Sequence, residues 1–243
     1  MLFRSEPGAA SAAERWADLG LHRLVSRLVS IVREEDALTV VTRVGAAGID
    51  AGVDCTWRWT PEAGGFRLAL DVAPDGRWPE GWTTHWARVG ISFSLPGEMD
   101  RVAWFGRGPG PAYPDTGQAA RPGWYRASVR SMPERTVRPQ ETGARAGVRR
   151  AWIGATGGPA LQVDADPAVA LTVRPWSTEV LAATDHDHLL RTDGRTHVVL
   201  DLAQAGIGTA SCGPGPLPAY RLTARRVHGS LRFTPRTMMG GPG

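Results

Sequence analysis

The sequence predicts an all-β protein, a large antiparallel sandwich of short strands. Apolar residues alternate with polar ones over many segments separated by turn residues, and this pattern is typical of strands with one buried face. The 243 residues include 30 Gly and 19 Pro, which suits strands joined by tight turns rather than a helical bundle. Hydrophobic residues make up 42% of the chain and charged residues 21%, so an ordinary core can be buried.

Three segments near the N-terminus are the first predicted elements. Residues 9–19 contain good helix formers with Ser11 as a candidate N-cap, so they predict a helix. Residues 24–32 fit either period, and their β-branched side chains favour a strand. Residues 37–44 also have strand character.

The clearest pattern is a hairpin. Val53, Cys55, Trp57 and Trp59 alternate with polar residues, the turn 61–65 follows, and residues 66–72 alternate again. Further strands are predicted at 89–95, 102–105, 161–165, 198–202 and 220–225. The predicted domain therefore spans 21–226, after an N-terminal segment at 1–20 and before a C-terminal tail at 227–243.

Charge and cysteine usage exclude several function classes. The net charge is +4, and all 28 basic residues are arginines scattered along the chain, so no nucleic-acid partner is expected. Cys55 and Cys212 form no CxxC pair, which argues against zinc, while a disulfide between them stays open. No stretch reaches the roughly 20 apolar residues of a membrane span. We expect a cytoplasmic protein without a cofactor.

The histidines and tryptophans admit two readings each. His186 and His188 would share a face on a strand and could bind a metal, but on a loop they form a solvated turn, and no third ligand is evident. No spacing supports an epimerase-like site built from His85, His197 and Glu141. Core packing is expected for Trp57 and Trp59, whereas three tryptophans of a loop-like stretch are interface candidates: Trp78, Trp82 and Trp86.

Two loops stand out from the strand background. Residues 104–117 read WFGRGPGPAYPDTG, in which glycines and prolines shape a rigid turn that presents Tyr113 and Asp115. A simple β-turn capped by Asp115 is the alternative. Residues 201–222 read DLAQAGIGTASCGPGPLPAYRL, and a connection of this length in a compact domain is often functional. It lacks the glycine motifs that lead into a phosphate-binding helix.

The order of three motifs identifies a family resemblance. WFGRGPGPAYPD, RPQETG and GIGTASCGPG resemble the WxGxGPxExYPD, PQENG and GxGTASCGPG loops in the last domain of β-galactosidases of glycoside hydrolase family 2. The resemblance covers about residues 16–222. It implies a large antiparallel β supersandwich of the galactose mutarotase-like type, packed against a catalytic barrel.

The same resemblance implies a function. In that family both catalytic glutamates lie on the barrel, and retaining hydrolysis needs two carboxyl groups about 5 Å apart. The chain alone is therefore expected to be inactive and to complete a galactoside site on a separate large chain that carries the barrel. Ser211, Cys212, Gly213 and Pro214 would lie nearest the sugar, and Tyr113, Asp115 and Glu141 are further candidates. A stand-alone carbohydrate-binding sandwich and an inactive truncated gene product are the alternatives.

Overall fold

A computed structural model describes residues 12–78, 86–208 and 215–237 of the chain. This part of the chain forms eleven β-strands, two short α-helices and several 3₁₀ turns. The helices are α1 (Ala12–Asp18) and α2 (Thr178–Ala183), and neither is long and apolar enough to cross a membrane. The strands are β1 (Val25–Arg33), β2 (Leu38–Gly45), β3 (Gly52–Glu62), β4 (Gly65–Asp75), β5 (Arg88–Pro96), β6 (Arg101–Gly108), β7 (Arg121–Ser128), β8 (Arg145–Gly154), β9 (Pro159–Arg174), β10 (Arg195–Gln204) and β11 (Val227–Thr237).

The strands of the described ranges are joined in one antiparallel sheet. Its main path is β1-β2-β3-β4-β11-β9-β8-β6-β7, and β10 branches from β9 to pair with β5. The length of β9 makes the branch possible, because its first half pairs with β11 and its last residues pair with β10. The predicted all-β antiparallel fold class is therefore confirmed.

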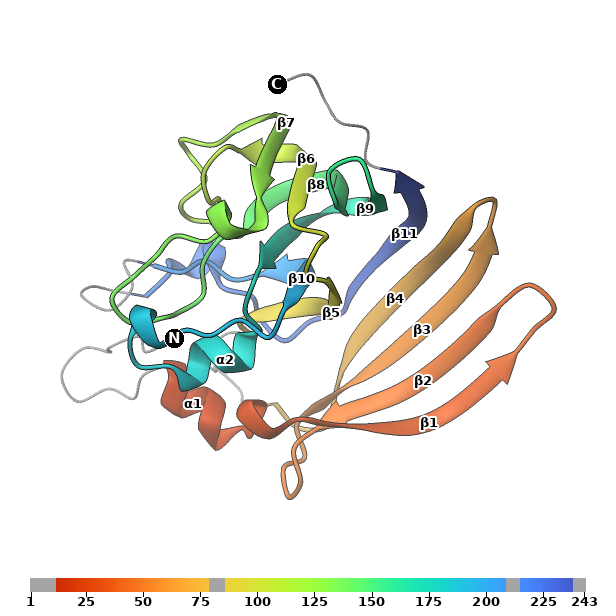
Figure 1. The fold of residues 1–243 in the computed structure, drawn as a ribbon. Helices are drawn as coiled ribbons and strands as arrows, with labels where there is room; N and C mark the ends of the chain where they lie inside the picture. Colours follow the sequence, from red (N-terminus) through yellow and green to blue (C-terminus); the bar gives the residue numbers. More distant parts are fainter. Residues whose placement is uncertain (1–11, 79–85, 209–214, 238–243) are drawn as a thin grey trace.

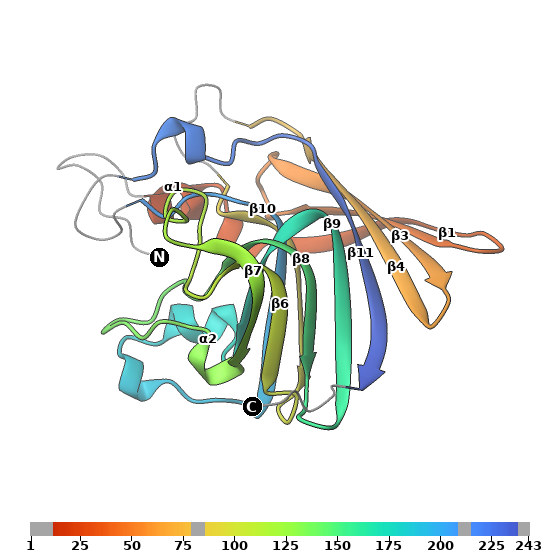
Figure 2. The same ribbon diagram turned by 90° about the horizontal axis from the view of Figure 1, so that it is seen from above.

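The sheet has two parts, which we call the wing (β1–β4) and the body (β5–β11). Figures 1 and 2 show the wing as a long curved set of hairpins that projects away from the body. β11 joins the two parts, because it pairs with β4 from Val227 to Phe233 and with β9 from Ser230 to Thr237. The sheet bends at β11. The two layers of the sandwich are therefore parts of one continuous sheet.

The main core lies inside that bend. Leu171 and Leu200 of the body are fully buried, as is Leu231 of β11. Phe233 meets Phe93 edge to face, with ring centroids 6.0 Å apart, and so links β11 to β5 across the core. Apolar burial of this kind is the main stabilising contribution to the fold.

Most predicted elements are present. The helix predicted at 9–19 is α1 in its described part, the segment 24–32 is β1, and the hairpin is β3–β4. The strand predicted at 220–225 is wrong. A 3₁₀ turn, η5 (Pro218–Tyr220), precedes it, and only a single bridge from Leu222 to Trp86 follows.

The predicted C-terminal boundary at 226 needs correction. β11 spans Val227–Thr237 and lies between β4 and β9, so the sheet continues well into the predicted tail. Pro235, which lacks a backbone donor, falls beyond the last β11 residue that pairs with β4. There β11 needs a partner on one side only, which is where a strand tolerates proline.

The tryptophans are distributed between core and surface differently from the prediction. Trp57 and Trp59 pack against the core, as predicted. Trp86, predicted to lie at an interface, is 5% exposed and packs with Ala205 and Leu222 in a small core cluster. Trp78 meets Trp86 edge to face at 5.1 Å, and Trp82 lies outside the described residues.

Candidate functional site

Three loops that are far apart in the sequence meet in the body. They are loop A (109–120) between β6 and β7, loop B (132–144) before β8, and loop C (205–226) between β10 and β11. Loops A and B are tied directly, because the Ala112 amide donates to the Ala144 carbonyl at 2.8 Å. Arg145, which is 3% exposed, donates to the carbonyl oxygens of Pro109, Gly143 and Met132. The first two predicted motifs therefore form one structural unit.

Asp115 ties loop A to loop C. Its Oδ1 accepts a hydrogen bond from the Ile207 amide at 3.0 Å, and its Oδ2 accepts one from the Gly208 amide at 2.7 Å. A carboxylate that receives two backbone amides makes strong, charge-assisted hydrogen bonds. A Cβ at Gly206 would lie 2.6 Å from this carboxyl group, so the close approach requires glycine. Asp115 thus fixes the backbone directly before residue 209.

The other end of loop C is held as well. The Gly206 amide donates to the Tyr220 carbonyl at 2.8 Å, so the two sides of the loop are joined at its base. Arg221 Nε donates to the Pro216 carbonyl at 3.0 Å. The predicted sugar-side residues Ser211, Cys212, Gly213 and Pro214 lie outside the described residues, between these two anchored sides.

Beneath loops A and B lies a charge cluster formed by Arg88, Glu141, Arg174 and Asp201. Arg88 pairs with Glu141, and its second nitrogen lies 3.6 Å from Asp201 Oδ2. Arg174 Nη1 lies 3.4 Å from Glu141 Oε2. Tyr113 caps the cluster, because its hydroxyl lies 3.4 Å from Glu141 Oε1. Two of the three described candidates, Tyr113 and Glu141, therefore meet in one network.

The sheet places this charge cluster on its face opposite the core. Asp201 follows the buried Leu200 on β10, so its side chain points to the other side. Asp201 and Arg174 are each 1% exposed, and loops A and B close over them. Polar atoms of these two residues and of two neighbours on the same strands have no hydrogen-bond partner within the described residues: Arg174 Nε, Asp201 Oδ1, Gln204 Oε1 and Thr172 Oγ1. Buried atoms of this kind are usually satisfied by internal water.

Burial sets the electrostatics of the charge cluster. It raises the pKa of Asp201 to about 7, against the opposing effect of the Arg88 charge. Burial lowers the pKa of Arg88, but the charges of Asp201 and Glu141 outweigh it, so the pKa lies above the usual value. Burial and the Glu141 charge also raise the pKa of the Tyr113 hydroxyl. Arg88 and Arg174 both form ion pairs with Glu141.

This arrangement suits support rather than catalysis. Glu141 is held by two arginines, and Asp201 is enclosed, so neither carboxyl group faces open space. Retaining hydrolysis needs an exposed pair that reaches one sugar from both sides. The network instead holds Tyr113 of loop A and Glu141 of loop B against β5 and β9.

Several of the central residues were not predicted. Arg88, Arg174 and Asp201 carry the charge cluster, and Arg145 joins loops A and B. Their signal in the sequence is a charged residue beside a β-branched or aliphatic run, as in LTVR and VVLD. A charge at such a position is rarely buried unless it is paired.

The turn that carries the histidine pair contacts loop B, because the Asp187 amide donates to the Val137 carbonyl at 3.1 Å and the Asp187 carboxylate pairs with Arg135. His186 and His188 flank Asp187 in a 3₁₀ turn, with ring centroids 5.7 Å apart. Among the residues that the structure describes, no group of three His, Cys, Asp or Glu side chains is placed to hold a metal ion. His197 contacts Asp193 at 3.0 Å, and His85 lies outside the described residues.

Comparison with known proteins gives a consistent result. The family model described as "Beta galactosidase small chain" matches residues 6–234. A beta-galactosidase of Arthrobacter sp. (strain B7) is 33% identical over 88% of this chain, which spans 21% of that relative. A beta-galactosidase of Staphylococcus xylosus is 27% identical over 90% of this chain and 22% of its own length. The chain therefore spans about a fifth of these relatives.

Solved structures with a related chain path are more distant. A galactose mutarotase related enzyme from Lactobacillus acidophilus has a TM-score of 0.44 and 9% identity, covering 90% of this chain and 73% of its own. A putative aldose 1-epimerase from Escherichia coli has a TM-score of 0.40 and 10% identity, covering 87% of this chain and 68% of its own.

Proposed function

Because this chain belongs to the β-galactosidase small-chain family, we propose that it completes the sugar site of a β-galactosidase whose catalytic barrel lies on a separate large chain. The assembled enzyme would hydrolyse terminal non-reducing β-D-galactose from β-galactosides. The chain spans only about a fifth of its relatives, and none of the carboxyl groups in the charge cluster is free to act. We therefore assign the catalytic glutamates to the large chain.

The observation that supports this role most directly is the anchoring of loop C. Asp115 holds the amides of Ile207 and Gly208, and Gly208 is the first residue of the GTASCGPG motif. Ser211, Cys212, Gly213 and Pro214 are the residues that we propose to reach the sugar. Tyr113, Asp115 and Glu141 would act as positioning residues, because Tyr113 is 4% exposed and Glu141 is held by two arginines.

The test is complementation in two parts. The Arthrobacter β-galactosidase, with the segment homologous to this chain removed, is mixed with the purified chain, and hydrolysis of o-nitrophenyl β-galactoside is followed. We expect no turnover from this chain alone and turnover from the mixture. Turnover by the chain alone would refute the assignment of the catalytic glutamates, and a silent mixture would count against the subunit role.

A further inference from the structure

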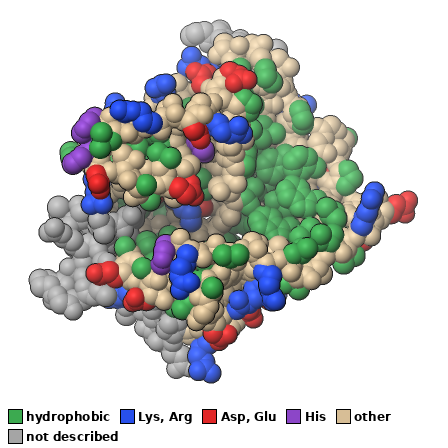
Figure 3. All heavy atoms as spheres, turned by 60° about the horizontal axis from the view of Figure 1, so that its bottom comes forward, with side chains coloured by type: hydrophobic (Ala, Val, Ile, Leu, Met, Phe, Trp, Pro, Cys, Tyr) green, Lys and Arg blue, Asp and Glu red, His purple; other side chains and the backbone are tan. Residues whose placement is uncertain are grey.

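The wing carries an apolar face that the body covers only in part. The face opposite its charged side includes Leu28 and Ile31 of β1, which are 56% and 58% exposed. Leu38 of β2 and Phe66 of β4 are 38% and 40% exposed. The register places these side chains in continuous rows, since Ile31 lies opposite Val40 and Leu38 lies opposite Trp59. Figure 3 shows hydrophobic side chains gathered in a broad hollow of the surface.

The edge strand β1 has exposed apolar side chains on both faces. Val25 and Val32 point to the side opposite Leu28 and Ile31, and they are 63% and 51% exposed. In the described chain β1 pairs with β2 alone, so its outer edge presents unpaired backbone groups. Strands that are apolar on both faces are typical of sheets covered on both sides. An exposed apolar edge is otherwise a site of aggregation that proteins avoid.

The rest of the face opposite Leu28 and Ile31 is charged and exposed to solvent. Its charged side chains form ion pairs with one another and with Arg226 of loop C, and these pairs are Arg43–Asp75, Arg58–Glu34, Arg67–Glu62 and Arg226–Asp71. One face of the wing is therefore charged and solvated, whereas the other is apolar and suited to contact with a partner. Contiguous apolar surface beyond a few hundred Å² usually marks an interaction site.

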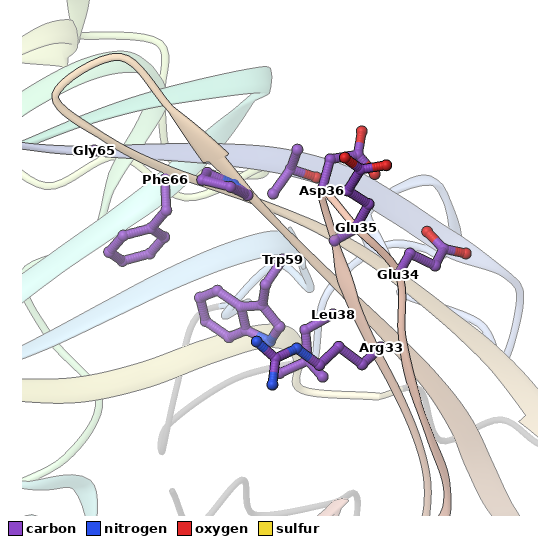
Figure 4. A pocket seen from close by; sticks show the side chains of 11 residues that line it. Arg33, Glu34, Glu35, Asp36, Leu38, Trp59, Gly65 and Phe66 are labelled. Atoms are coloured by element: carbon purple, nitrogen blue, oxygen red, sulfur yellow. The ribbon is translucent and has the colours of Figure 1, made fainter.

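A cavity at the far end of the wing continues the apolar face. It is an open pocket of about 620 Å³ between the two hairpin turns, lined by the apolar residues Leu38, Trp59, Pro61 and Phe66 and by the charged residues Arg33, Glu34, Glu35 and Asp36. Figure 4 shows Trp59 beside Leu38, with Glu34, Glu35 and Asp36 on the turn above. An apolar or aromatic side chain fits this floor, and a neighbouring basic residue would suit the acidic turn.

From these features we infer that the apolar face and free edge of the wing form the docking surface for the remainder of the β-galactosidase polypeptide. This inference rests on the proposed function. The relatives carry about four fifths of their length outside the segment that matches this chain, and that polypeptide must pack against this domain. The partner surface is apolar, with a basic residue opposite the turn at Glu35, and it approaches β1 from its unpaired edge. A second copy of this chain is the competing occupant.

The experiment uses full-length chain and the same Arthrobacter fragment. The double variant Leu28→Asp with Ile31→Asp places charge on the apolar face, and Leu189→Asp is the matched control, because Leu189 is 48% exposed and lies in the body. We expect the double variant to bind at least about tenfold more weakly, as for a centrally placed apolar contact, and the control to bind normally. Hydrogen exchange on unaltered chain should show protection of residues 24–33 when the fragment is added.

The outcomes separate this inference from the proposed function. If the double variant binds and complements as well as the unaltered chain, the docking surface is overturned while the subunit role stands. If the unaltered chain binds through residues 24–33 but restores no turnover, the docking surface stands and the proposed function fails. If the chain does not bind, both are overturned. A stable dimer of the lone chain in sedimentation, with residues 24–33 protected, would assign the surface to a second copy and overturn the inference.

Discussion

Asp201 is a buried carboxyl group, and its titration should make the free energy of unfolding depend on pH. The folded chain keeps the proton up to a pKa of about 7, against an ordinary value of 3.8. Between these values the unfolded chain binds fewer protons, so the free energy of unfolding should fall as pH rises from about 4 to about 7. A difference of about 3 pH units corresponds to at most about 4 kcal/mol.

The Asp201→Asn variant isolates this effect, because asparagine does not titrate. Urea unfolding between pH 4 and pH 8 should show the unaltered protein losing stability relative to the variant as pH rises. Asp100→Asn, at an exposed position with 51% of its side chain accessible, should follow the unaltered curve. Parallel curves for the unaltered protein and Asp201→Asn would show that the pKa of Asp201 is not raised in the folded chain.

Asp115 gives a second prediction at the scale of a single residue. Replacing it with alanine leaves the Ile207 and Gly208 amides without their acceptor, at a cost of about 1–3 kcal/mol. Hydrogen exchange at residues 207 and 208 should become faster, and complementation of the large fragment should weaken. Asp100→Ala should leave both unchanged. Unaltered exchange at these two amides would show that the carboxylate does not hold loop C.

The site was only partly predictable from the sequence because some of its residues lie in distinctive loops and others lie within strands. Tyr113, Asp115 and Glu141 stand in loops rich in glycine and proline, and such loops attract attention as candidates. Arg174 and Asp201 stand in strands, where a charge gives no sign of its partner. Arg174 pairs with Glu141 of loop B, and the antiparallel register of β10 on β5 brings Asp201 near Arg88. Both partners come from segments distant in the sequence.

At the scale of elements, alternation predicted the strands whose pattern is regular and not those in which it is interrupted. β3 and β4 alternate cleanly and are joined by a short turn. β7 and β8 were missed, since Pro122 and Gly123 interrupt the first and a bulge interrupts the second between Arg145 and Arg150. β11 alternates from Val227 to Phe233, but its partner strands lie far back in the chain. Its proline and its place near the C-terminus made a tail the simpler prediction.

The joining role of β11 leads to a stability prediction. Phe233 is 4% exposed and stacks on Phe66 of the wing at 5.0 Å while meeting Phe93 of the body at 6.0 Å. Phe233→Ala should therefore lower the free energy of unfolding by about 3–5 kcal/mol. Phe105→Ala, at a position 37% exposed on β6, should cost clearly less in the same denaturant titration. Equal losses would mean that β11 does not hold the two parts together.

For the whole molecule, the balance between a buried core and an uncovered wing decides how the lone chain behaves. The body buries its apolar residues inside the bend of the sheet, whereas the wing leaves Leu28, Ile31 and Leu38 accessible. A folded protein with such a surface should bind a hydrophobic dye such as anilinonaphthalene sulfonate without unfolding, because binding removes apolar surface of both the dye and the wing from water.

The dye then reports on the wing in the absence of any partner. We expect Leu28→Asp with Ile31→Asp to abolish most of the fluorescence increase, and Leu189→Asp to retain it, while circular dichroism stays the same for all three proteins. Adding the Arthrobacter fragment to the unaltered chain should release the dye, since both would occupy one surface. Strong dye fluorescence from the double variant would show that the dye binds apolar surface elsewhere on the chain. The apolar face of the wing would then not be the main exposed apolar surface in solution.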